Sequence, residues 1–149
     1  MPALAPALDG LSLDITQEIH VRSSLEATFK ALLEEMGPAN QGQNATPMPM
    51  ILEAWPGGRW FRDLDGGAGH LWGFVQAIKP PTLLELFGPM FMSSPVAGHM
   101  IIRLSPITGG TKLVFQNQVF GPLPAEMRGE GMAQGWDDML KRLRKDVER

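Results

Sequence analysis

The feature that most constrains this chain is an apolar stripe close to its end. Six large apolar residues follow one another at steps of four, three, one, three and four: Met132, Trp136, Met139, Leu140, Leu143 and Val147. An α-helix has about 3.6 residues per turn, so this spacing places all six side chains on one face. Charged residues such as Asp137, Lys141 and Arg144 fall on the opposite face. A helix with so bulky an apolar face requires a large concave partner.

Glycines leave two interpretations of where this helix begins. Gly129, Gly131 and Gly135 fall within or before the stripe, and a glycine inside a helix costs about 1 kcal/mol relative to alanine. In the first interpretation the helix begins near Gly131, and residues 123–130 form a looser turn. In the second, Gly135 lets the helix approach a strand closely, and Trp136 fills the adjoining space.

The segments before this helix predict one strand, one short helix and then a meander. Residues 13–21 alternate between apolar and polar side chains, which is typical of a strand. Residues 23–26, Ser-Ser-Leu-Glu, fit a capping box at the start of a helix that ends at Gly37 and Pro38. Further strands are predicted over residues 50–55, 59–64, 70–78, 82–87, 98–105 and 111–120. Polar or methionine-rich loops are expected over 39–49, where the loop could act as a mobile lip, and over 88–95.

This order of elements predicts an α+β fold with helices segregated to one face of an antiparallel sheet. We expect a curved sheet of six to seven strands wrapped around the long C-terminal helix, with the short helix after the first strand. With 149 residues the chain has the usual size of one core. Residues 1–12 are expected to form a flexible tail and residues 13–149 a single domain.

Composition excludes several classes of protein and of site. The chain has no cysteine, which excludes disulfides, thiolate metal sites and cysteine nucleophiles. Its formal net charge is −3, with basic and acidic residues spread along the sequence, so no nucleic-acid footprint is present. The beginning of the chain lacks the basic region of a signal peptide, and no apolar run reaches the length of a membrane span. These features predict a soluble cytoplasmic protein that binds neither nucleic acid nor membrane.

The ordered set of motifs resembles a known family. The matching residues, in order, are the Pro56-Gly57-Gly58 turn before Trp60, Gly73-Phe74-Val75, Pro80-Pro81, Leu84, Gly110-Thr111, Leu113, Phe115, and Gly135-Trp136 with Leu140 and Leu143. In order and spacing they resemble the Aha-type proteins, homologues of the activator of a heat-shock chaperone ATPase. That family lies within the SRPBCC, or START-like, superfamily, which shares the Bet v helix-grip fold. One departure is the polar loop after Gly37, where the family often has a tryptophan.

The resemblance implies a cavity between the C-terminal helix and the sheet. The superfamily includes lipid carriers, polyketide cyclases, plant hormone receptors and cochaperone domains, so the ligand and the reaction stay open. The expected partner is a hydrophobic small molecule, lipid-like or polyketide-like, and a homodimer or a chaperone partner is a further possibility. No cofactor is expected. We expect entry to the cavity near the loops 39–49 and 88–95.

Aromatic, methionine and polar residues on the predicted strands and helix are the candidate cavity residues. The candidates are Trp60, Arg62, Trp72, Phe74, Phe87, His99, Met100, Phe115, Met132, Trp136, Met139 and Leu140. Arg62 has two interpretations. If it shares the concave face with Trp60, it is a buried cation that needs an anion; the favoured interpretation is that Phe61 faces inward and Arg62 is solvated.

Histidine chemistry gives no strong signal. His20 is expected to face solvent, His70 to lie at a sheet end, and His99 to face either side of its strand. No two histidines have the spacing of a metal pair, so neither a metal site nor a nucleophile beside its base is predicted.

Three functions therefore remain from the sequence. The first is small-molecule binding. The second is an enzyme of cyclase or hydrolase type that would use Arg62, His99, Glu85 or Asn117. The third is a protein-interaction module. Convergent ionisable groups in the cavity would favour the enzyme, an apolar cavity the carrier, and an exposed apolar patch the interaction module.

Overall fold

The computed structural model describes residues 11–127 and 130–149. Within them the chain forms a seven-stranded antiparallel sheet in the order β1-β7-β6-β5-β4-β3-β2, which confirms the predicted α+β fold. The strands are β1 (Ser12–Val21), β2 (Ile51–Leu52), β3 (Arg59–Asp63), β4 (Gly69–Lys79), β5 (Leu83–Phe87), β6 (Ala97–Ile107) and β7 (Gly110–Phe120). Strands β2 to β7 pair as a meander, and β1 closes the sheet by pairing with β7, Ser12 opposite Phe120 and Val21 opposite Thr111.

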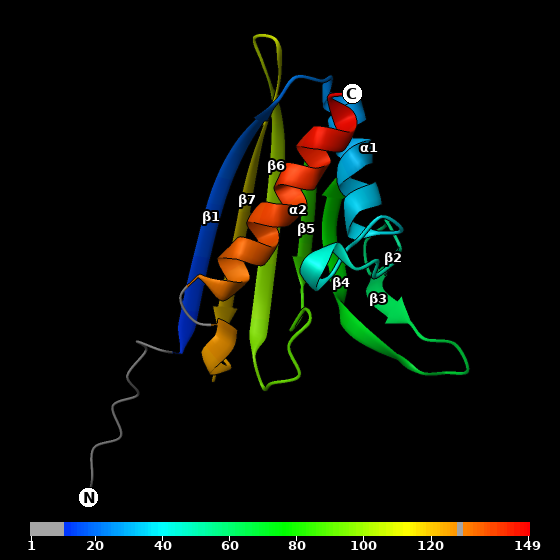
Figure 1. The fold of residues 1–149 in the computed structure, drawn as a ribbon, viewed down its shortest axis with the longest axis vertical. Helices are drawn as coiled ribbons and strands as arrows, with labels where there is room; N and C mark the ends of the chain where they lie inside the picture. Colours follow the sequence, from blue (N-terminus) through cyan, green and yellow to red (C-terminus); the bar gives the residue numbers. More distant parts are fainter. Residues whose placement is uncertain (1–10, 128–129) are drawn as a thin grey trace, which may run out of the picture.

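Two α-helices lie on the concave side of this sheet. Helix α1 (Leu25–Met36) follows β1, and helix α2 (Gly131–Val147) crosses the sheet so that its C-terminal end lies beside α1 (Figure 1). Two short 3-10 turns, η1 (Gln43–Ala45) and η2 (Ala125–Met127), lie in the connections. No helix among residues 11–127 and 130–149 has the length and apolar character needed to cross a bilayer.

The beginnings of the two helices refine the sequence analysis. Ser24 caps α1, and its hydroxyl accepts a hydrogen bond from the amide of Ala27 at 3.1 Å. Glu26 is then the second helical residue and not the third, so the predicted reciprocal capping box is replaced by a simple serine cap. Helix α2 begins at Gly131, as the first interpretation predicted. A side-chain carbon added at Gly135 would have no neighbour within 4 Å, so the predicted close approach to a strand is wrong.

Strand β2 is much shorter than the predicted 50–55 because the backbone turns directly after it. The amide of Trp55 donates to the carbonyl of Glu53 at 2.9 Å, and the amide of Gly58 donates to the carbonyl of Trp55 at 2.8 Å. These local bonds use groups that a longer strand would offer to its neighbour. The loop between α1 and β2 is also held by two hydrogen bonds between Asn40 and Met48. The backbone amide of Met48 donates to the carbonyl of Asn40, and the side-chain amide of Asn40 donates to the carbonyl of Met48, each at 2.9 Å.

A β-bulge between β3 and β4 changes which side chains face inward. Trp60 pairs with Gly73, but the next residue, Phe61, pairs with Leu71, so Trp72 is an extra residue on β4. A bulge of this kind interrupts the alternation of a strand. As a result Trp72 and Gly73 are both buried, whereas Phe74 turns to the convex face and stacks on Phe87 at 5.6 Å between ring centroids.

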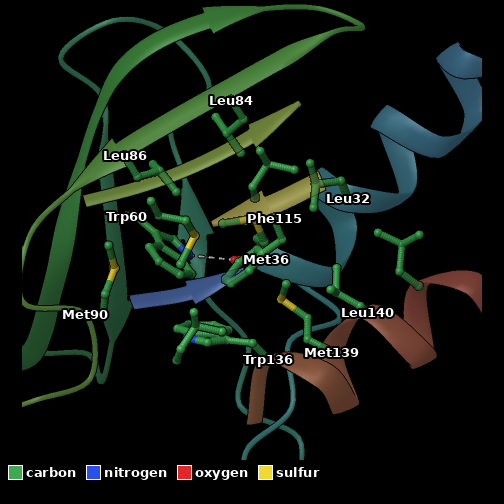
Figure 2. Close-up of a cluster of buried hydrophobic side chains, with 14 of the residues drawn as sticks. Leu32, Met36, Trp60, Leu84, Leu86, Met90, Phe115, Trp136, Met139 and Leu140 are labelled. Atoms are coloured by element: carbon green, nitrogen blue, oxygen red, sulfur yellow. Dashed lines mark hydrogen bonds between the residues drawn. The ribbon is translucent and has the colours of Figure 1, made fainter. Parts of the chain in front are cut away.

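The core lies between the helices and the concave face. Side chains from α1, α2 and the strands meet there, including Leu32, Met36, Trp60, Leu84, Phe115 and Leu140 (Figure 2). The indole Nε1 of Trp60 donates a 2.7 Å hydrogen bond to the carbonyl of Met36 at the end of α1. This bond satisfies a carbonyl that the helix leaves unpaired and fixes α1 to the sheet.

Candidate ligand-binding cavity

A cavity of about 1210 Å³ opens between the N-terminal part of α2, the loop 40–48 and the β3–β4 hairpin. In Figure 1 these three segments surround the part of the concave face that α1 leaves uncovered. The sequence predicted a cavity between the last helix and the sheet, entered near loops 39–49 and 88–95, and residues from both loops line it. A volume of this size is sufficient for a small organic ligand, since ligand sites commonly measure about 300–1,000 Å³.

Aromatic rings and methionines form the inner wall. Phe91, from the loop before β6, lies between Trp72 and Trp136, with ring centroids 5.7 Å and 6.0 Å away. Met132 and Met139 continue this wall along α2, because they lie one turn on either side of Trp136. Trp136 in turn packs on Phe115 of β7 at 5.5 Å. The wall is therefore apolar and is supported by the core behind it.

Charged residues and a histidine also line the cavity. Arg62 on β3 pairs in register with His70 on β4, and both side chains line the cavity. Lys141 and Arg142 line it from α2, and each of these cations already has a carboxylate partner. The Nζ of Lys141 lies 2.7 Å from the Oδ2 of Asp137, and the Nε of Arg142 lies 3.5 Å from the Oε2 of Glu35.

Glu35 is a buried carboxyl at the junction of the two helices. Its side chain is nearly inaccessible to solvent, and it lies between Arg142 and Asp146 of α2. Burial raises the pKa of Glu35 from 4.5 to about 7, and the neighbouring Asp146 adds to this rise, whereas Arg142 opposes it. The junction of α1 and α2 therefore contains a carboxyl that titrates near neutral pH.

Several buried polar atoms near the cavity have no hydrogen-bond partner within the described residues. They include the Nε1 atoms of Trp72 and Trp136 in the wall and both side-chain polar atoms of Asn117 on β7. Asn117 is fully buried and lies beside Ile15 of β1 and Met100 of β6. These atoms are covered by other protein atoms, so a ligand would reach them only after the wall had moved.

The structure divides the predicted cavity residues into three groups. Five of them line the cavity: Arg62, Trp72, Met132, Trp136 and Met139. Four are fully buried in the core behind it: Trp60, Met100, Phe115 and Leu140. The remaining three lie on the convex face: Phe74 and Phe87, which stack on each other, and His99, whose Nε2 lies 3.3 Å from Glu85. Glu85 accompanies His99, and Asn117 is fully buried behind the wall, so three of the four candidate catalytic groups lie outside the cavity and only Arg62 lines it.

The favoured interpretation of Arg62 is wrong, because Phe61 does not face inward. Trp60 is fully buried on the concave side, Arg62 is half-buried on the same side, and Phe61 lies under the guanidinium of Arg59 at 4.4 Å on the other. Side chains alternate regularly along β3, so Arg62, two residues after the fully buried Trp60, lies on the same side of the sheet as Trp60.

Sequence reasoning missed four parts of the lining. Lys141, predicted on the charged face of α2 opposite the apolar stripe, lines the cavity together with Asp138 and Arg142. His70 was expected only at a sheet end, yet it lies opposite Arg62. Phe91 was placed in a loop and not in the wall, although its position between Met90 and Met92 was a signal of burial. The polar loop residues 40–45 were expected near the entrance but were not named individually. His20 faces solvent as predicted and lies 2.9 Å from Glu18.

Metal-ligating groups do not gather anywhere in residues 11–127 and 130–149. No group of three or more histidine, aspartate or glutamate side chains there has the arrangement of a metal site. The cavity offers a ligand apolar contacts and hydrogen-bond donors, among them Arg62 and His70.

Comparison with known proteins places the chain in a family. The model of the family described as Activator of Hsp90 ATPase homolog 1-like protein matches residues 23–148. The chain belongs to this family. A search of curated proteins found no sequence that matches this chain.

Solved structures with the same fold include several that share 20% or less of their sequence with this chain. An uncharacterised protein from Rhizobium leguminosarum is 20% identical, with a TM-score of 0.71 and coverage of 93% of this chain and 95% of the other. Ara h 8.0201 is 15% identical (TM-score 0.67, 91% and 97% coverage). The Aha1 dimer from Colwellia psychrerythraea, solved in solution, is 18% identical (TM-score 0.63, 91% and 96% coverage). At these identities the comparisons establish the helix-grip fold and no more.

Proposed function

We propose that this chain is a cytoplasmic small-molecule binding protein that holds a largely hydrophobic ligand between α2 and the sheet. The observation that carries the proposal is the cavity of about 1210 Å³ with an aromatic and methionine wall. An open apolar wall of this kind is a common basis of ligand recognition, and methionine side chains adapt to ligands of varied shape. The proposed site consists of Arg62, Trp72, Met132, Trp136 and Met139 together with His70 and Phe91.

Gly135 offers a way to block this cavity without disturbing the core. It lines the cavity, and a side chain added there would meet open space. We expect the native protein to bind an apolar fluorophore saturably at micromolar concentration. Gly135→Phe should weaken that binding about tenfold, which corresponds to about 1.4 kcal/mol, because the ring would occupy the cavity.

Gly135→Ala is the matched control, because it removes the same glycine and adds only one methyl group. It should keep dye affinity, and circular dichroism should show that both variants are folded. Native mass spectrometry of the purified protein would show whether a ligand has been retained from the cell. Absence of saturable dye binding to the folded native protein would contradict the proposal.

An enzyme is the second candidate, because the cavity is not purely apolar. Arg62 and His70 face each other across β3 and β4, and hydrogen bonds from such groups are strong where water is excluded. A cyclase or hydrolase would convert a bound ligand, so the mass of a retained or added ligand would change with time. An unchanged mass over many binding half-lives would favour carriage.

A protein-interaction module is the third candidate, and the convex face supports it. Leu71 and Phe87 are each almost half exposed there, next to Phe74. A homodimer and a chaperone are the partners to test. Sedimentation of the wild type and of Phe87→Ser would detect self-association through this face, since removing the apolar ring would weaken it.

A further inference from the structure

We infer that the ligand is an amphipathic carboxylate whose charged end binds Arg62 and whose apolar body lies against the aromatic wall. This inference rests on the proposed ligand-binding function and specifies the chemistry of the ligand. It follows from the pairing of the charged residues that line the cavity, from the position of Arg62 and from the wall behind it.

Of the three arginine and lysine side chains that line the cavity in the described part of the chain, two are already neutralised by carboxylates. Lys141 is held by Asp137 and Arg142 by Glu35. Asp138, the acidic residue of the lining, accepts a 2.9 Å hydrogen bond from the side chain of Gln134. Among the charged lining residues that the structure describes, Arg62 therefore differs in having neither an ion pair nor a side-chain hydrogen bond.

Arg62 is held where it is partly removed from water. Its side chain is half-buried, on the concave side of β3, between the buried Trp60 and the exposed Leu64. A guanidinium partly removed from water gains most from an anion that can accept two parallel hydrogen bonds, and a carboxylate has that geometry. His70, directly opposite on β4, can donate a further hydrogen bond to the same group.

The charge of the cavity also indicates the charge of the ligand. One unpaired guanidinium balances one negative charge, which fits a monoanionic carboxylate better than a phosphate monoester with nearly two charges at neutral pH. The wall of Trp72, Phe91 and Trp136 lies deeper in the same cavity. A ligand with a carboxylate at one end and a hydrocarbon or aromatic body would therefore satisfy both parts at once.

Displacement of the bound fluorophore by matched twelve-carbon probes tests this inference. The probes are dodecanoate, dodecanol, dodecyl phosphate and dodecyltrimethylammonium, each below its micelle-forming concentration. We expect dodecanoate to displace the dye at about 10- to 100-fold lower concentration than dodecanol, because a charge-assisted hydrogen bond is worth about that factor. Dodecyl phosphate should bind less tightly than dodecanoate, and the ammonium probe least.

Arg62→Gln should lower dodecanoate affinity by about the same 10- to 100-fold and leave dodecanol affinity unchanged. Arg62→Lys, which keeps the charge without the two-pronged geometry, should be intermediate. Arg103→Gln is the matched control, because Arg103 is an exposed arginine of β6 on a position that faces away from the core. It should leave every probe unaffected, and circular dichroism should confirm that all variants fold.

The outcomes separate this inference from the function on which it rests. Equal affinity for dodecanoate and dodecanol, or equal loss of both in Arg62→Gln, would overturn the carboxylate and leave the hydrophobic cavity in place. Tighter binding of the phosphate or the ammonium probe would likewise overturn it. Failure of the dye itself to bind would instead overturn the proposed function.

Discussion

The two halves of α2 carry the same apolar stripe and meet different surroundings. Toward its C-terminal end, α2 packs against α1, and Leu140 and Leu143 are fully buried. Toward its N-terminal end the same stripe continues through Met132 and Trp136, but there the sheet is covered by the loop 40–48 and not by a helix. The C-terminal half is part of the filled core, and residues of the N-terminal half line the cavity.

The amphipathic pattern of a helix therefore specifies which face is turned inward, but it does not specify what fills the space in front of that face. Filling depends on the partner element. Helix α1 is twelve residues long and ends at Met36, where Trp60 binds its last carbonyl. Between Met36 and β2 the chain forms only the short 3-10 turn η1 and no further α-helix, and the cavity lies between this loop, α2 and the sheet.

The largest expected effect is in the filled half. Leu143→Ala should lower the free energy of unfolding by about 3 to 5 kcal/mol, because the leucine is fully buried and its removal leaves a void. Affinity for the apolar dye should be unchanged in the fraction that folds. Urea unfolding followed by circular dichroism measures the first quantity, and dye titration measures the second. A loss below about 0.5 kcal/mol, typical of exposed sites, would contradict the picture of a filled half.

A smaller effect on stability is expected from the matching residue in the open half. Trp136→Ala should cost about 1 to 3 kcal/mol, because the indole is only 6 % exposed but lines the cavity, so that neighbouring side chains and water can fill part of the space it leaves. Dye binding should fall markedly at the same time. Saturating dye should raise the stability of the wild type more than that of the variant. If Leu143→Ala and Trp136→Ala lost the same amount of stability and the same amount of dye affinity, the distinction between the two halves of α2 would be wrong.

The smallest expected effect concerns Glu35, which lies where the two halves meet. Its pKa is raised from 4.5 to about 7 in the folded protein, so between these values the folded state binds more protons than the unfolded state. Stability from this carboxyl is therefore fully present below about pH 4.5 and is lost as the pH rises toward about 7.

The free energy of unfolding of Glu35→Gln should lack this pH dependence, so the difference between wild type and variant, measured by urea unfolding at several pH values, should change across this range. Glu34→Gln is the control, since Glu34 is the exposed neighbour on the same helix. Arg142 and Asp146 face Glu35 and are present in both variants. Equal pH dependence in the two variants would show that Glu35 does not titrate in this range.

The sequence predicted the fold well because its signals are local. The stripe on α2, the serine at the start of α1 and the alternation of β1, β6 and β7 depend on residues close together in the chain, and each element appeared where the pattern placed it. The prediction of a flexible tail falls mainly on residues 1–10, which lie outside the described residues, as do residues 128 and 129 of the turn before α2.

The orientation of the site residues was harder to predict because it depends on register. The bulge at Trp72 turns Phe74 to the convex face, and the pattern of apolar and polar residues in β4 does not predict this extra residue. His99 could have been placed from its neighbours, since Met100 and Ile102 are both buried and a strand alternates. The opposition of Arg62 and His70 follows only from the pairing of β3 with β4.

The pairing of β1 with β7 also has a consequence for the order in which the protein acquires its structure. Synthesis from the amino end delivers β1 early, yet its partner strand is separated from it by α1 and by β2 to β6, with Ser12 opposite Phe120. Such a distant contact is slow to form, because a long stretch of chain must be ordered first. The emerging chain therefore holds β1 without its neighbour until β7 leaves the ribosome. Helix α2 comes later still, and its docking beside α1 completes the cover over the inner surface of the sheet.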